Sequence, residues 1–278
     1  RRYSSNVTTL SAPWGQHIPL AAAETELEKG DVGAVCVVHN ETSVGLANDL
    51  AALAPSVRKS GALFLVDGIS AVAGIPVAID AWGIDAIVAG SQKGLAAPAG
   101  LAMVHLSDRA AERLKPKTFY LDLAQHLSQI EKNDTPWTPA VPLFLALREA
   151  LVLLKEETLE GRLKRTRALA EATRAAADAL GLELFPTRAH ASDTVTAIRN
   201  PAGLDDTAVR KTLQDRYNVL VQGGQGSVKG KIFRIGHMGI ADWPDLLVTF
   251  AGLEKILKAH GRDVAPGAAA AAIEPFMP

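Results

Sequence analysis

Asp67 and Lys93 are the two residues of this chain whose types and positions most clearly suggest chemistry. Asp67 ends the apolar run Leu63–Val66, and Lys93 follows a second apolar run, Ala86–Ala89, after a short turn. A lysine near an acid can form a plain salt bridge. The same pair can also hold pyridoxal 5'-phosphate (PLP), with the lysine as Schiff-base partner and the acid on the pyridine nitrogen. The two residues by themselves leave both interpretations open.

The elements that must position this pair are two strands. Four consecutive apolar residues, Leu63–Val66, predict a fully buried parallel strand, since such a strand is covered on both faces. In open α/β sheets ligands bind outside the carboxyl ends of the strands, which is where Asp67 falls. Lys93 follows the end of a second predicted strand, which we expect to neighbour the first. The pattern therefore predicts an α/β protein with both residues at one edge of the sheet.

The residues around this pair closely resemble one enzyme family, the class V aminotransferases. Within it, the similarity is greatest to the alanine–glyoxylate and serine–pyruvate aminotransferases. It extends from about Trp14 to Lys258. It implies the PLP-dependent transferase fold of type I, with a mostly parallel-sheet large domain and a smaller C-terminal α+β domain. The segments that carry the resemblance are Val66–Ser70, Ile75–Val77, Asp80–Asp85, Gly90–Leu95 and Pro98–Gly100.

The resemblance gives Lys93 and Asp67 their expected roles. Lys93 would form the aldimine with PLP, for which it must attack as a free amine. Asp67, as a buried carboxylate, would keep the ring nitrogen protonated, the state in which PLP draws electrons from the substrate. Asp67 could also be a purely structural acid in a strand-end turn. We reject this alternative because the spacing between Asp67 and Lys93 is that of the family.

Three further residues are implied to contact the cofactor. Ile69 would pack on one face of the ring, and Gln92 matches a phosphate-binding position; a core isoleucine and an exposed glutamine are the alternatives. The turn His39–Gly45 resembles a His-x-Glu-x-Ser-x-Gly loop whose serine, here Ser43, lies beside the cofactor. A polar loop that caps the helix predicted over 49–59 is an equal alternative for this turn.

Arg234 is the candidate for substrate binding. An arginine inside the apolar strand 231–236 needs a partner, because burying its charge unpaired is costly. Its planar fork matches a carboxylate, and the resemblance implies that Arg234 grips the α-carboxylate of the substrate. His237 is expected to be structural. The glycine-rich stretch 222–226 is expected to be a flexible loop near the substrate and no nucleotide site.

Thr138 is the candidate for a contact across a subunit interface. In the eukaryotic alanine–glyoxylate enzymes a tyrosine and, three residues later, a threonine reach the partner's phosphate. Thr138 keeps the threonine, whereas Thr135 stands where the tyrosine would be. The resemblance thus predicts a homodimer with one phosphate contact altered. The alternative is a rigid proline-rich loop that leads into a helix at Leu143.

The rest of the chain predicts three regions: 1–142 as an N-terminally incomplete PLP-binding domain, 143–262 as a linking helix and small domain, and 263–278 as a low-complexity, poorly ordered tail. One long helix is expected over 143–180, with the basic run 162–167 on a solvated face. Strands are expected at 7–10, 182–185, 194–198, 219–222 and 231–236.

Composition narrows the class of protein. The net charge is −1 and charges are not grouped in long blocks, so nucleic acid and membrane surfaces are not expected partners. No apolar run approaches the ~20 residues of a membrane span. One cysteine, Cys36, excludes an internal disulfide and suits a reducing cytosol, which predicts a cytoplasmic protein.

Two functions follow as hypotheses. The first is an aminotransferase that moves the amino group of alanine, serine or a similar donor to glyoxylate or pyruvate. The second is a truncated, cofactor-poor or regulatory relative without turnover. Cysteine desulfurase is disfavoured because Cys36 lies inside an apolar strand.

The chain also lacks a Ser-Gly-Thr phosphate cradle. We therefore expect the C-terminal part of a longer protein, with an open face beside Asp67 and Lys93 and no bound PLP.

Overall fold

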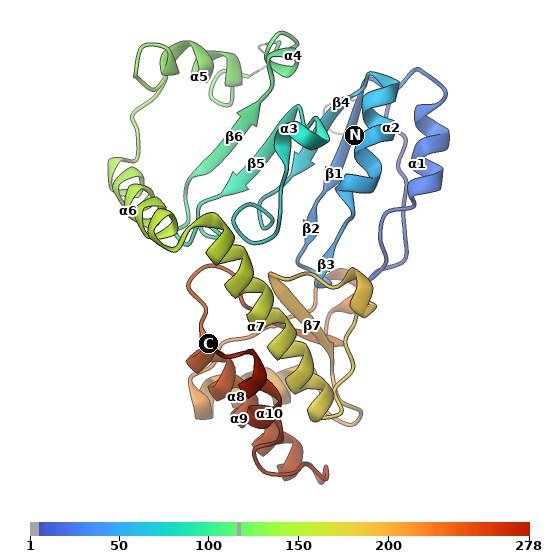
Figure 1. The fold of residues 1–278 in the computed structure, drawn as a ribbon, viewed down its shortest axis with the longest axis vertical. Coiled ribbons are helices and arrows are strands. Elements are labelled where there is room, and N and C mark those ends of the chain that lie inside the picture. Colours follow the sequence, from blue (N-terminus) through green and yellow to red (C-terminus); the bar gives the residue numbers. More distant parts are fainter. Residues whose placement is uncertain (1–5, 116–117) are drawn as a thin grey trace.

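The computed structural model describes residues 6–115 and 118–278, which form two lobes joined by a pair of helices (Figure 1). The first lobe is built on a sheet of order β1-β4-β5-β6. The first three strands are parallel and β6 is antiparallel to β5. A mostly parallel α/β sheet is what the sequence predicted. Its strands are β1 (Ala34–Val38), β4 (Leu63–Asp67), β5 (Ala86–Gly90) and β6 (Ala102–Leu106).

Helices cover one face of this sheet. The core beneath them contains the inward-facing Phe64, Val66 and Ile87 together with helical Leu50 and Leu53. The intervening residues of β4 remain partly exposed, so burial alternates along the strand. The prediction of a strand buried on both faces is therefore wrong for the part of the chain that the structure describes. The covering helices are α1 (Leu20–Leu27), α2 (Leu50–Ser60) and α3 (Ile79–Trp82).

Two helices, not one, connect the lobes. The expected long helix over 143–180 breaks at Thr158, whose φ of 66° lies in the left-handed region that a threonine rarely adopts. Thr158 also starts the second helix, because its Oγ1 accepts a hydrogen bond from the Gly161 amide at 3.0 Å. Two short helices come earlier. The short helices are α4 (Asp108–Ala111) and α5 (Leu123–Ile130), and the connecting helices are α6 (Val141–Glu157) and α7 (Leu159–Ala179).

The basic run at the start of α7 is only partly solvated, contrary to the prediction: Lys164 and Arg167 are exposed, whereas the rest of the run is partly or fully buried. Arg162 is only 4% exposed and Thr166 is fully buried. Arg162 and Arg165 both bond Glu157, the last residue of α6. The charge pattern of the run gave no sign of this because Glu157 lies outside it and becomes a neighbour only through the break at Thr158.

The second lobe contains a three-stranded antiparallel sheet of order β7-β9-β8. Its helices enclose a core centred on Phe233 and Phe250. Residues 182–185 do not form the expected strand; Leu184 makes only an isolated bridge to Ile198. The elements are β7 (Val195–Arg199), β8 (Gln222–Gly223), β9 (Ile232–Gly236), α8 (Asp206–Tyr217), α9 (Trp243–Ala259) and the single turns η1 (Arg188–His190) and η2 (Gly226–Val228).

The alanine-rich C-terminal segment is folded, and the expectation of a poorly ordered tail is wrong. It forms α10 (Ala268–Ile273) and the turn η3 (Glu274–Phe276). Ala269 and Ile273 are fully buried in the core of the second lobe. Glu254 of α9 accepts hydrogen bonds from the Gly267 and Ala269 amides and so caps α10. At the other end of the chain, residues 7–10 form no strand.

A buried amide joins the two lobes. Asn40, 4% exposed, donates through Nδ2 to Ser70 Oγ at 2.8 Å and to Thr194 Oγ1 at 2.7 Å. Its Oδ1 accepts from Ser192 Oγ at 2.5 Å. Asn40 and Ser70 belong to the first lobe, and Ser192 and Thr194 lead into β7 of the second. The lobes therefore meet through a specific polar network next to the candidate site.

Candidate active site

Asp67 lies at the carboxyl end of β4, in line with the sequence prediction. One carboxylate oxygen accepts a hydrogen bond from the Ile69 amide at 3.0 Å. The Gly68 amide donates to Val88 O at 3.0 Å, which holds the turn against β5. The residue is exposed, so the expected burial of the carboxylate is wrong for the described residues. Asp67 is exposed because one face of the sheet is not covered by helices. An open face beside Asp67 was expected from the sequence.

The turn that carries Lys93 has a tightly held backbone. Ser91, fully buried, donates through Oγ to Pro98 O at 2.7 Å and accepts from the Leu101 amide. At Gly94 a Cβ atom would lie 2.3 Å from Val72 O, so a larger residue would push the turn away. Lys93 itself is partly buried and makes no ion pair within the described part of the chain. The turn is fixed while the amine stays available.

Ile69 and Gln92 meet above the end of β5. A Cβ atom on Gly90 would lie 3.1 Å from Gln92 Oε1 and 3.3 Å from Ile69 Cγ2. Both side chains therefore lie close to Gly90, three residues before Lys93. Ile69 is 38% exposed, which does not suit a core isoleucine, and Gln92 is exposed as well.

The loop with Ser43 joins β2 (Asn40–Glu41) to β3 (Leu46–Ala47). It packs against the second lobe at Gly45, where a Cβ atom would lie 2.8 Å from Ala197 N. Helix α2 is capped by Asp49, whose carboxylate accepts from the Ala52 amide at 3.0 Å. Ser43 therefore does not cap this helix, which removes the structural alternative. Its hydroxyl makes no hydrogen bond to any residue that the structure describes.

Arg234 reaches from β9 to the same loop. Its Nη1 donates to Thr42 O at 2.7 Å and its Nε to Gly223 O at 2.9 Å. The residue is 9% exposed, and burial lowers the pKa of its guanidinium despite the nearby Glu41. Within the described residues it forms no salt bridge. A buried guanidinium held by two carbonyls retains its full charge and the capacity to bind a carboxylate.

His237 is structural, as expected. Its Nδ1 bonds Asp193 O at 2.7 Å and its Nε2 bonds Thr196 Oγ1 at 2.8 Å. Since a carbonyl only accepts, Nδ1 carries the proton and Nε2 accepts from the hydroxyl. Burial lowers the pKa of His237 to about 3, so the ring is neutral.

Thr138 is not brought to the other candidate residues. It is exposed in the connection between α5 and α6, and no hydrogen bond links it to them in the described ranges. The neighbouring Thr135 donates to Trp137 O at 2.7 Å, which stiffens the connection. The predicted contact of Thr138 across a subunit interface stays a prediction.

Two residues of the site were missed by the sequence reasoning. Asn40 is the polar hub between the lobes described above. His39 lies at the end of β1, where its amide donates to Asp67 O at 3.0 Å and its ring meets Trp82 edge to face. Its Nδ1 is buried and has no hydrogen-bond partner among the described residues, and burial lowers the pKa of His39 to about 4. Both belong to the turn 39–45, where the pattern drew attention only to the serine.

These residues suit PLP. Within residues 6–115 and 118–278, Asp67 offers a carboxylate without an ion pair, Lys93 an amine in a fixed turn, and Ser43 and Gln92 side chains without a hydrogen bond. Ile69 presents an apolar surface between them. The donor set therefore comprises what a phosphorylated, aromatic aldehyde needs: an anion for the ring nitrogen, an amine, an apolar contact and phosphate-binding groups.

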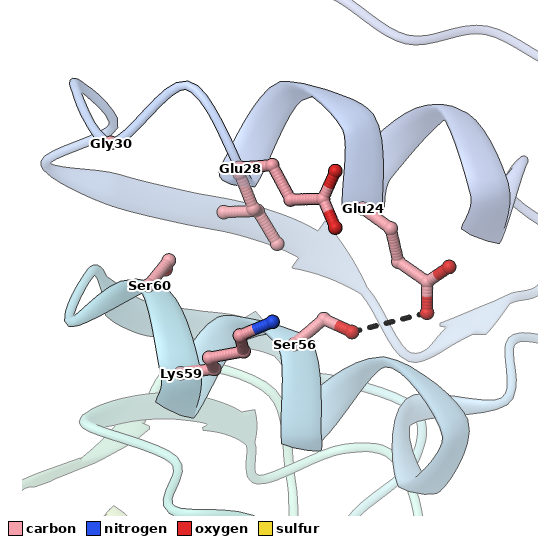
Figure 2. A pocket seen from close by; sticks show the side chains of 7 residues that line it. Glu24, Glu28, Gly30, Ser56, Lys59 and Ser60 are labelled. Carbon is pink, nitrogen blue, oxygen red and sulfur yellow. Dashed lines mark hydrogen bonds between the residues drawn. The ribbon is translucent and has the colours of Figure 1, made fainter.

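A large hollow on the surface lies elsewhere. It measures about 590 Å³ and is located between α1 and α2, where Glu24 accepts a hydrogen bond from Ser56 at 3.1 Å (Figure 2). Glu28 and Lys59 also line it, and none of the candidate residues does. Its walls are surface side chains of two helices, so we do not connect it with the site.

The family model of the class-V aminotransferases matches residues 1–239. The chain belongs to this family. It is 43% identical, over 95% of its length and 70% of the relative, to an uncharacterized aminotransferase of Methanocaldococcus jannaschii. It is 36% identical to a serine–glyoxylate aminotransferase of Arabidopsis thaliana, covering 100% of this chain and 72% of that one.

A solved structure gives the same result. The ureidoglycine–glyoxylate aminotransferase of Bacillus subtilis superimposes with a TM-score of 0.91 at 33% identity, covering 99% of this chain and 73% of that one. The class-V aminotransferase therefore has the type I fold of the PLP-dependent transferases, as the sequence indicated. No helix among residues 6–115 and 118–278 has the length and apolarity needed to cross a membrane.

Proposed function

We propose that this aminotransferase uses PLP bound to Lys93 to move an amino group from a small amino acid, alanine or serine, to glyoxylate or pyruvate. The observation that carries the proposal is the geometry of Arg234, a buried guanidinium without a salt bridge in the described chain. Burying an unpaired charge costs several kcal/mol, which a bound carboxylate would offset. The relatives named above that have an assigned acceptor use glyoxylate.

In this proposal each residue has a defined task. PLP, when bound, supplies the electron-withdrawing ring that stabilises charge at the substrate α-carbon. Asp67 holds the proton of the ring nitrogen, and Ile69 packs on the ring. Lys93 binds the cofactor and moves the proton at the substrate α-carbon, the general-base role that a deprotonated lysine can serve.

The remaining residues bind and orient. Ser43 and Gln92 contribute hydrogen bonds to the phosphate side of the cofactor. Arg234 fixes the α-carboxylate through its fork, which sets the direction of the α-carbon bonds relative to Lys93. A non-catalytic relative is not favoured, because the chain keeps the acid, the lysine and the arginine together.

Reconstitution tests the proposal most directly. Purified protein is mixed with PLP, its visible spectrum is recorded, and alanine, serine and other amino acids are then added one at a time. Spectral change with alanine or serine, followed by its reversal with glyoxylate or pyruvate, is the expected result. If the chain binds PLP and responds to none of these donors, the proposed substrate class is wrong.

We also propose that the active unit is a cytoplasmic homodimer. Apolar side chains are exposed along α6, just before α5 and at the last residue of α5, and a patch of this kind is typical of an interaction surface. Thr138 lies in the connection between the same two helices, where a partner subunit would bring it to a phosphate. The exposed apolar residues are Phe119, Tyr120, Leu121, Ile130, Val141, Phe144, Leu145, Leu151, Val152 and Leu153.

Sedimentation tests the dimer. Leu145→Asp places a charge in the centre of this patch and should shift the protein from dimer to monomer. Leu220→Asp is the matched control, since Leu220, 70% exposed against 60% for Leu145, lies in the second lobe. A parent protein that sediments as a fully active monomer would contradict the proposal.

A further inference from the structure

Three charged residues at the joint between α6 and α7 form a compact cluster. Glu157 Oε2 accepts from Arg162 Nε at 2.5 Å, and Glu157 Oε1 accepts from Arg165 Nε at 2.7 Å. The side chain of Arg162 is 5% exposed. Burial alone would raise the pKa of Glu157, but the hydrogen bonds from Arg165 and Arg162 outweigh it and lower the pKa. The two arginines therefore favour the ionised form of Glu157.

One arm of the cluster holds the turn that carries the reactive lysine. Arg162 Nη1 donates to Gly94 O at 2.9 Å, in a buried hydrogen bond that joins α7 to the first lobe. Gly94 directly follows Lys93, and its backbone is already pressed against Val72 O. The guanidinium and the packing thus fix the peptide next to Lys93 from two directions.

The other arm holds the loop that follows β9, the strand of Arg234. Arg165 donates through Nη2 to Gly239 O at 2.9 Å and through Nη1 to Ala241 O at 2.5 Å. A Cβ atom on Gly239 would lie 3.3 Å from Lys93 O. The loop of the second lobe therefore rests directly on the lysine turn, and the cluster bonds both.

Stability alone does not account for this arrangement. A buried ion pair is often no more stabilising than apolar residues of the same volume, because both charges lose their hydration. What charges provide and apolar contacts do not is direction, since each guanidinium fork donates along fixed lines. Here the hydrogen bonds from the two guanidinium groups go to the backbone next to Lys93 and to the loop after the strand of Arg234.

We infer that Glu157, Arg162 and Arg165 are positioning residues for the reaction. They set the position of the Lys93 turn relative to the β9 loop, so that the amine and the carboxylate-binding arginine act on one bound substrate. The inference rests on the proposed function, since it takes Lys93 as the reactive amine and Arg234 as the carboxylate ligand. It adds residues that touch neither cofactor nor substrate.

The two arms predict different kinetic effects. The ammonium of lysine carries all its donors on one nitrogen, so it cannot reproduce the separate directions in which Nε and Nη1 of Arg162 bond Glu157 and the Gly94 carbonyl. Arg162→Lys should lower kcat about 10-fold with little change in KM, the effect of losing one hydrogen bond to a charged group. Arg165→Lys should raise KM about 10-fold with little change in kcat. Arg167→Lys is the matched control, because Arg167 is exposed on the same helix, and it should resemble the parent.

A second measurement uses the chain without cofactor. Amide hydrogen exchange of residues 91–97, where Ala96 and Ala97 donate within the turn, should quicken about 10-fold in Arg162→Lys and stay unchanged in Arg167→Lys. Thermal unfolding checks that each variant is folded. A merely structural role would lower the melting temperature and the active fraction without separating kcat from KM.

The outcomes are decisive. Parent-like exchange and kinetics in Arg162→Lys, or equal changes in Arg162→Lys and Arg167→Lys, would overturn the inference. If the parent transaminates none of the substrates, the proposed function fails, whereas quickened exchange in Arg162→Lys alone would still show that the cluster holds the lysine turn. The two failures are thus distinguishable.

Discussion

The end of the first-lobe sheet and the interior around the second-lobe sheet differ in how far their polar side chains are paired with other residues. Beside β4 and β5, Asp67 and Lys93 are free of ion pairs within the described chain and accessible. Around β7 and β9, both ring nitrogens of His237 are bonded and the ring is fully enclosed. Unsatisfied polar groups at a sheet edge indicate a ligand, whereas satisfied ones in a core hold the fold. Substitutions should therefore affect chemistry in the first region and stability in the second.

Lys93→Ala gives the largest effect expected at the open edge. The variant should fold, since the side chain makes no ion pair, yet lose covalent attachment of PLP and all transamination. Borohydride reduction followed by mass spectrometry measures the attachment, and thermal unfolding supplies the control for folding. Retained turnover would sink the assignment of Lys93.

Asp67→Asn comes next. The amide keeps the shape of the side chain but cannot hold the proton on the ring nitrogen, so PLP should still bind while most of the rate is lost. Cofactor binding is followed by absorbance and the rate by single-turnover kinetics. A variant as fast as the parent would mean that Asp67 is only structural. The contrast between a chemical role at the sheet edge and a structural role in the core would then not hold for Asp67.

Arg234 lies between the two regions and sharpens the comparison. Arg234→Lys loses the fork and should weaken amino-acid and keto-acid binding by roughly 1.5–3 kcal/mol, the range for a hydrogen bond to a charged group. PLP affinity should hardly change. Titration with PLP and with substrate separates the two, and a loss of cofactor affinity alone would show that Arg234 has been assigned the wrong ligand.

The core histidine predicts an effect of pH on stability. The pKa of His237 is lowered to about 3, below the ordinary 6.5, so the unfolded chain binds its proton first as pH falls. The free energy of unfolding should then drop between pH 6.5 and 3, by roughly 2–3 kcal/mol from pH 7 to pH 4.5 for this residue. His39 shifts in the same direction.

Urea unfolding at several pH values checks this. His237→Gln should be less stable than the parent at pH 7 but should lose less stability on acidification. His126→Gln, at an exposed position of α5, is the control and should keep the slope of the parent. If the slope of His237→Gln equals that of the parent, the acid sensitivity arises elsewhere.

Local patterns predicted the fold and the candidate residues where the causes are local. Asp67 and Lys93 could be placed because each follows an apolar run, and runs of this kind end at the ligand edge of a parallel sheet. The break at Thr158 could not be predicted, because the tertiary structure imposes its positive φ, which a threonine rarely adopts.

Burial was predicted less well because it depends on distant residues. The alanine-rich segment 268–273 folds because Glu254 caps it and a core receives it, and no periodicity within the segment shows this. Arg162 is buried because Glu157 and the Gly94 carbonyl meet it, one from the preceding helix and one from the other lobe. Asn40 escaped notice for the same reason.

The Asn40 network also sets an order of events during folding. Its amide is satisfied by Ser192 and Thr194, about 150 positions later in the chain. The loop that these contacts close is long, and contacts of such separation form late because their closure entropy must first be overcome. While the first lobe emerges from the ribosome, Asn40 can bond Ser70, but its hydrogen bonds with Ser192 and Thr194 have to wait for the second lobe. The first lobe should therefore reach its final stability only after the second has been synthesised and has docked.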